Sequence, residues 1–155
     1  QGEASHAMRY LREHRLDEVI CNLKQPILGI CIGQQLMCRH SEEGDVDCLG
    51  IFETDVLRFQ PQRHEDKVPH MGWNDLKVHT PQSSPDELFQ GFHNGEFVYF
   101  VHSFYVPLCP WTIAETEYIL PFSAALHRDN FYATQFHPEK SGSVGERILK
   151  NFLAL

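Results

Sequence analysis

Apolar residues recur with a helical period in three segments of the chain. Two stripes, over residues 4–11 and 16–23, have apolar side chains three and four positions apart, so each shares one face of a helix. We expect both faces to pack against a sheet. A further helix is predicted near the C-terminus, where Ser143 and Glu146 have the spacing of a capping box and an apolar face follows.

Runs of apolar and β-branched residues predict strands over 27–30, 49–59, 75–78, 97–106, 112–118, 122–127 and 131–136. Asp129 and Asn130 separate the last two runs, which indicates a hairpin. Strands mixed with helices predict an α/β fold, with an open mixed, mainly parallel sheet flanked by helices and with additional antiparallel strands. We expect residues 1–155 to form a single domain, because the chain shows no internal repeat and its length suits one core.

Cys31 stands in the most informative local motif. It follows the apolar run of residues 27–30, and Gly29 and Gly33 lie two positions on either side of it. This is the spacing of a nucleophile elbow, with Cys in place of Ser, and a helix is predicted to follow over 34–40. The positive end of that helix would favour the thiolate, which is the reactive form. Taken alone, a cysteine after an apolar strand is more often a buried core residue.

His137 and Glu139 supply the groups that a nucleophilic thiol needs. His137 follows the last predicted strand, and residues i and i+2 of an extended chain point to the same side. The pair therefore predicts a general base and a carboxylate that orients it. A lone His-Pro-Glu is more often a surface loop, but its occurrence together with the elbow favours a site for nucleophilic hydrolysis.

The composition restricts the classes of function. The net charge of −8 argues against a nucleic-acid surface. The apolar runs are shorter than the roughly 20 residues that span a bilayer, so no membrane association is expected. Five irregularly spaced cysteines fit reduced thiols in the cytoplasm, and neither they nor His64 and His70 have the paired spacing of a zinc site. We therefore expect no metal.

Two segments, GICIGQQL (29–36) and QFHPEKSG (135–142), resemble the class I glutamine amidotransferases. Three further segments are similar to the glutaminase subunit of imidazole glycerol phosphate synthase: PHMGWN (69–74), FVHSFY (100–105) and the C-terminal residues 142–153. The resemblance covers nearly the whole chain.

This resemblance implies a Cys-His-Glu triad of Cys31, His137 and Glu139 and an oxyanion donor in the amide of Ile32. It also implies three residues that hold substrate glutamine: Gln35, Ser103 and Phe104. Relatives often have Tyr at the position of Phe104, so no hydroxyl contact is expected there. No cofactor is implied.

The N-terminal residues 1–8 resemble the end of the family's Pro-Gly-x-Gly turn and the helix after it. That turn supplies the second oxyanion amide. The resemblance implies about 50 residues before Gln1, carrying the first strands of a domain of ordinary size. With Gln1 at the variable position of the turn, the second donor would be a terminal amine, and the chain would be a poor enzyme.

The implied function is hydrolysis of glutamine to glutamate and ammonia, with the ammonia passed to a (β/α)8-barrel cyclase subunit in histidine biosynthesis. Trp73, Asn74 and Lys140 are predicted partner contacts, although Trp73 could be ordinary core and Lys140 a solvated lysine. Two alternatives remain open: a non-catalytic docking or regulatory partner with the same fold, and a glutaminase for anthranilate or GMP synthesis. The segment 70–74 argues against the second alternative.

Overall fold

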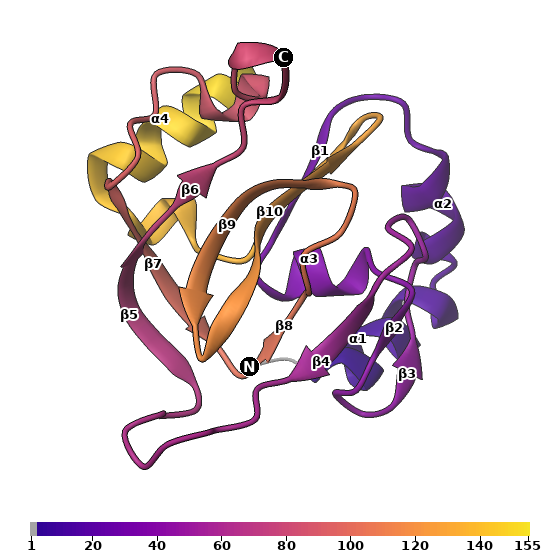
Figure 1. Cartoon of the computed structure of the whole chain (residues 1–155). Coiled ribbons are helices and arrows are strands. Elements are labelled where there is room, and N and C mark those ends of the chain that lie inside the picture. The colour runs from indigo at the N-terminus through magenta and orange to yellow at the C-terminus, as the bar shows by residue number, and fades with distance from the viewer. Residues whose placement is uncertain (1–2) are drawn as a thin grey trace.

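The computed structural model describes residues 3–155, so the predicted role of Gln1 lies outside the described residues (Figure 1). The helices are α1 (Ala4–Glu13), α2 (Leu16–Asn22), α3 (Ile32–Leu36) and α4 (Gly142–Leu153). Three short 3-10 turns are η1 (Pro81–Ser83), η2 (Glu87–Phe89) and η3 (Pro138–Lys140).

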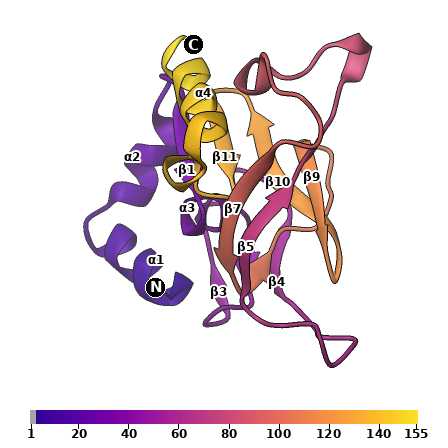
Figure 2. The same cartoon turned by 90° about the vertical axis from the view of Figure 1, so that its left-hand side faces the viewer.

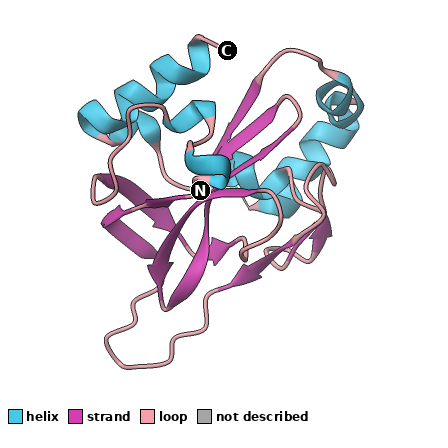
Figure 3. Ribbon diagram, turned by 45° about the horizontal axis from the view of Figure 1, so that its top comes forward, coloured by secondary structure: helices cyan, strands magenta, loops and turns pink. Residues whose placement is uncertain are grey.

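The strands form three sheets. The first has the order β1 (Ile27–Ile30), β11 (Phe131–Thr134), β10 (Leu120–Arg128), β9 (Thr112–Tyr118) and β6 (Lys77–Val78). The second has the order β3 (Val46–Asp47), β2 (His40–Ser41), β4 (Asp55–Arg58) and β8 (Phe104–Tyr105), and the third pairs β5 (His70–Asp75) with β7 (Phe97–His102). Helices α1, α2 and α3 lie to the left in Figure 2, with β5, β7 and β9 to their right. The loop between β4 and β5 extends from the strand side, away from the helices (Figure 3).

The α/β class and the additional antiparallel strands are confirmed, but parallel pairing contributes less than expected. Within residues 3–155, two pairs are parallel, β1 with β11 and β2 with β4, and the other six are antiparallel. The reason is local: β9, β10 and β11 follow one another through short turns, and such turns permit only antiparallel neighbours. The predicted hairpin at Asp129 and Asn130 is confirmed between β10 and β11.

Two apolar clusters make up the core. The larger is rich in phenylalanine, with Phe59, Phe100, Phe122 and Phe136 each at most 1% exposed. The smaller lies around Phe52 and Val56, beside α3. Helix α1 buries Ala4 and Met8, as its stripe predicts, whereas α2 has no buried residue and leaves Val19 exposed.

Several predicted boundaries are wrong. Of residues 49–59, only Asp55–Arg58 form a strand. The strand predicted over 97–106 is interrupted at Ser103. The strand predicted to begin at Asp75 is preceded by β5, so strand pairing begins at His70 instead. The capping box is also wrong, because Ser143 lies inside α4 and the position before the helix is Ser141. Ser141 instead donates from Oγ to the carbonyl of His137 and accepts from the amide of Tyr99. Within residues 3–155, no helix is long and apolar enough to cross a membrane.

The two glycines around Cys31 differ in how much space surrounds them. A Cβ on Gly29 would lie 2.8 Å from the backbone of Gly33, whereas a Cβ on Gly33 would meet nothing within 4 Å. We expect Gly29→Ala to destabilise the fold by about 1–3 kcal/mol, since neither backbone can move aside without disturbing the turn at Cys31. Chemical denaturation measures this change.

Gly33→Ala is the matched control. It adds the same methyl group in open space within α3, and we expect the free energy of unfolding to change by less than about 0.5 kcal/mol. Equal losses in the two variants would contradict the close approach of β1 to α3.

Candidate active site

Cys31 occupies a sharp turn between β1 and α3. Its backbone has φ 55° and ψ −108°, a conformation that a side-chain-bearing residue adopts only under constraint. The amide of Cys31 donates to the carbonyl of Thr134 at 2.8 Å, and its carbonyl accepts from the amide of Gln34 at 3.1 Å. The predicted elbow is therefore present, and it places the thiol at the end of a strand in the middle of the fold.

The thiol is half-buried and has polar neighbours. Its Sγ is 3.7 Å from the carbonyl of Val101 and 3.7 Å from Nε2 of Gln135. Burial raises the pKa of Cys31 above its usual value, and the amide of Ile32 opposes this rise. A thiolate is expected from the helix dipole, but the net shift of the pKa is upward, because desolvation by burial is the largest cause and α3 has only five residues. The thiol needs a base.

His137 and Glu139 form the predicted pair. Nδ1 of His137 lies 2.8 Å from Oε2 of Glu139, which is carried by η3 directly after the histidine. A carboxylate accepts, so Nδ1 carries the proton and Nε2 the lone pair. The amide of His137 donates to the carbonyl of Tyr99 at 2.9 Å, which fixes the loop to β7. This arrangement suits a base that takes a proton at Nε2.

Cys31 and His137 line the same cavity, which has a volume of about 340 Å³. The other lining residues are Ile30, Ile32, Gln35, Glu43, Val101, His102, Ser103, Phe104 and Lys140. The structure thus brings together residues from four distant parts of the chain, including seven of the predicted site residues. A volume of this size accommodates a small metabolite.

The predicted substrate residues form one wall of the cavity. Gln35 is 4% exposed, and its Nε2 donates to the carbonyl of Phe104 at 3.1 Å and to Oε1 of Gln135 at 3.0 Å. Ser103 is half-buried and Phe104 is buried, with the guanidinium of Arg58 over the ring of Phe104 at 5.6 Å. The side-chain amide nitrogen of Gln35 therefore forms hydrogen bonds within the protein that stabilise this wall of the cavity.

Three residues at the site were missed by sequence reasoning. Glu43 lines the cavity, its Oε1 accepts from the amide of Ala4 at 3.0 Å, and burial raises its pKa. It stands in the acidic segment 42–47, where no local motif marks it as a site residue. Gln135 and His102 are buried polar residues, and the only sequence signal was their place beside motif residues.

Of the three predicted partner residues, Lys140 lines the cavity, whereas Trp73 and Asn74 do not. Trp73 is 54% exposed on β5, with its ring 5.9 Å from that of Tyr99, so it is not a core residue. Asn74 is half-buried and donates to the carbonyl of Glu117 at 3.0 Å. Lys140 is exposed, lines the cavity, and forms no ion pair within residues 3–155. Over the same residues, no cluster of three or more His, Cys, Asp or Glu side chains is arranged to hold a metal ion.

Comparison with known proteins identifies the family. The family model for glutamine amidotransferase class-I matches residues 6–155. The chain is 67% identical to imidazole glycerol phosphate synthase subunit HisH of Bacteroides thetaiotaomicron, over 99% of this chain and 76% of that protein. It is 48% identical to the subunit of the same name from Escherichia coli (strain K12), with the same coverage.

Solved structures agree in fold. A putative GMP synthase subunit from Thermoplasma acidophilum superposes with a TM-score of 0.63 at 23% identity, covering 90% of this chain and 61% of that one. A glutamine amidotransferase from Thermotoga maritima gives 0.61 at 19% identity, covering 99% and 59%. The chain thus spans about three-fifths of the length of these structures. Cys31 at the elbow and His137, which is paired with Glu139, line one cavity, and this chain belongs to the class I glutamine amidotransferases.

Proposed function

We propose that this chain is the glutaminase subunit of an imidazole glycerol phosphate synthase. It hydrolyses glutamine to glutamate and ammonia, and the ammonia passes to a (β/α)8-barrel cyclase subunit in histidine biosynthesis. The observation that carries the proposal is the cavity shared by Cys31 and His137, with Glu139 bound to the far nitrogen of the base. The identity to HisH subunits supports this pathway over GMP or anthranilate synthesis.

The geometry supports a two-step reaction. His137 takes the proton of Cys31 at Nε2, and the sulfur attacks the side-chain amide carbon of glutamine. The negative oxygen that results is stabilised by the amide of Ile32, and the tetrahedral intermediate collapses as His137 gives its proton to the departing ammonia. Water activated by His137 then hydrolyses the thioester to release glutamate.

Glu43 supplies negative charge at the cavity wall. Glutamine carries an ammonium group on its α-carbon, and we assign Glu43 as its counter-charge, since it contributes the carboxylate among the lining residues.

We also assign residues 1–155 to one domain. The free state of all five cysteines supports a cytoplasmic location.

Cys31 is expected to be the one essential thiol. A diazo-ketone analogue of glutamine should alkylate Cys31, and Cys31→Ala should abolish ammonia release, because no other cysteine lies at an elbow. Peptide mass spectrometry locates the label. Alkylation of Cys38 or Cys109 with Cys31 unmodified would contradict the assignment.

His137→Ala is expected to lower kcat more than Glu139→Gln does. His137 moves the proton, a role that contributes about 10²–10⁴-fold, whereas Glu139 orients the ring and stabilises its charged form. Steady-state glutaminase assays with the barrel subunit present measure both. Wild-type activity in Glu139→Gln would remove Glu139 from the triad.

The partner surface is tested with Trp73→Ala and Lys140→Ala. Loss of an aromatic anchor costs about 2 kcal/mol, or roughly 30-fold in Kd, and Lys140 has a charge available for a partner carboxylate. Titration calorimetry with the barrel subunit measures affinity, and circular dichroism checks folding. Tyr10→Ala is the matched control, since Tyr10 is similarly exposed, at 57%, but lies on α1. Unchanged affinity in both variants would show that docking uses another face.

A further inference from the structure

We infer that His70 and His102 are positioning residues for the glutamine cavity, because their mutual hydrogen bond fixes the carbonyl of Phe104. This inference rests on the proposed function. The reaction as described above uses neither histidine, yet both are buried, at 4% and 5% exposure. Within residues 3–155, neither forms an ion pair. Two buried imidazoles in contact are costly unless their donors and acceptors match.

The contacts permit one arrangement of protons. Nδ1 of His102 lies 2.7 Å from the carbonyl of Phe104, and a carbonyl only accepts, so this nitrogen carries the hydrogen. Nε2 of His102 is then the acceptor, and Nδ1 of His70, 3.0 Å away, must donate to it. Nε2 of His70 is in turn an acceptor, and Nδ2 of Asn74 lies 3.5 Å from it.

Burial keeps both rings neutral. It lowers the pKa of His70 to about 4 and that of His102 to about 3. At neutral pH each ring therefore has one donor and one acceptor, as the contacts require. The direction of donation, from Asn74 through both histidines to the carbonyl of Phe104, is thus fixed.

The carbonyl of Phe104 connects this pair to the nucleophile. It also accepts from Nε2 of Gln35 at 3.1 Å, and the same nitrogen donates to Oε1 of Gln135 at 3.0 Å. Nε2 of Gln135 lies 3.7 Å from Sγ of Cys31. Loss of the donor at His102 would leave the Phe104 carbonyl with Gln35 as its one side-chain partner, and this segment of the cavity wall would lose an anchor.

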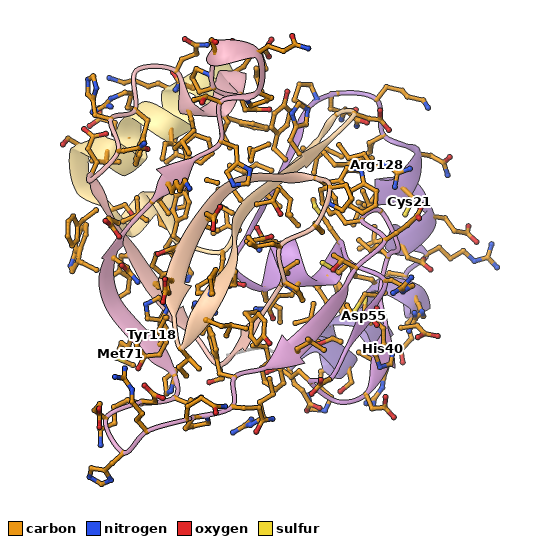
Figure 4. The ribbon with its side chains drawn as sticks, in the orientation of Figure 1. Cys21, His40, Asp55, Met71, Tyr118 and Arg128 are labelled. Atoms are coloured by element: carbon orange, nitrogen blue, oxygen red, sulfur yellow. The ribbon has the colours of Figure 1, made fainter. Side chains whose placement is uncertain are left out.

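Packing offers a competing explanation for the same residues. The ring of His70 stacks on Tyr118, with centroids 4.2 Å apart and planes 12° apart, and on Phe100 at 4.8 Å. Figure 4 shows Tyr118 beside the exposed Met71, on the side of the molecule where β5 runs. If stacking were the whole role of His70, any flat ring would serve there.

Two substitutions at His70 separate the explanations. His70→Phe keeps a flat ring for stacking but removes the donor to His102. His70→Asn loses the ring but places an amide N–H near the position of Nδ1. Positioning through the hydrogen bond predicts that His70→Phe is the more stable variant and yet the less active one, with kcat lowered about tenfold. It predicts that His70→Asn, although less stable to heat, retains the higher kcat.

Stacking alone predicts the reverse order of activity, so wild-type kcat in His70→Phe would overturn the inference. His127 provides a matched control: its ring stacks on Tyr132 at 3.9 Å and its nitrogens bond to Asp86 and to the carbonyl of Asp129, but it does not line the cavity. We expect His127→Phe and His127→Asn to change stability and leave kcat unaltered.

Nitrogen NMR of the imidazole rings gives a readout that does not depend on glutaminase activity. In the wild-type chain, His102 should be protonated at Nδ1 alone, with Nε2 accepting from His70. In His70→Phe the proton should stay on Nδ1, and the Nε2 resonance of His102 should move toward that of an imidazole nitrogen that accepts no hydrogen bond. An unchanged Nε2 resonance of His102 in His70→Phe would show that His70 does not donate to it, and would overturn the inference even if glutamine hydrolysis is observed. Absence of hydrolysis in the wild-type chain with its partner, together with the expected NMR shift, would instead count against the proposed function alone.

Discussion

The turn at Cys31 is the constraint on which the site depends. A positive φ at a residue with a side chain is unfavourable, and here it is held by the carbonyl of Thr134 on one side and by the amides of Gln34 and Gln35 on the other. Gly29 allows β1 and α3 to approach closely enough for this to happen. Because β1 pairs in parallel with β11, the same register that anchors Cys31 also brings the end of β11, and so His137, to the cavity. One pair of strands therefore delivers both residues to which we assign the reaction.

Burial at this turn has opposing effects on the thiol. It raises the pKa of Cys31, so the resting group is neutral and only weakly nucleophilic. In the proposed reaction, the same exclusion of water would strengthen every interaction with charge that develops during attack, including those with the amide of Ile32 and the imidazole of His137. In the proposed reaction, such a thiol would react only when substrate, base and oxyanion donor are together, which would limit unproductive chemistry at the sulfur.

The sequence predicts what depends on local spacing and misses what depends on distant contacts. The elbow at residues 29–33 and the pairing of His137 with Glu139 involve residues at most four positions apart, and both are present. The capping box at Ser143 fails because Gly142 adopts φ 61° and Ser141 is engaged with the backbone of Tyr99, 42 residues away. His70 and His102 are 32 residues apart, and each resembles an ordinary strand residue until β5 and β7 are paired. Glu43 was missed for a similar reason: it stands among acidic neighbours in the sequence, and only the folded chain places it at the cavity.

Strand β7 connects the exposed side chain of Trp73 to the loop that carries His137. The carbonyl of Tyr99 accepts from the amide of His137, and its amide donates to Ser141, so both backbone groups of one residue hold the loop of the base. The ring of Tyr99 lies against Trp73, opposite it in the pair of β5 and β7. A ligand shifts a conformational equilibrium only as far as its affinities for the two states differ. A partner seated on Trp73 would therefore influence His137 only if it favoured one position of Tyr99 over another, and the two hydrogen bonds of that residue are the contacts through which such a preference would reach the base.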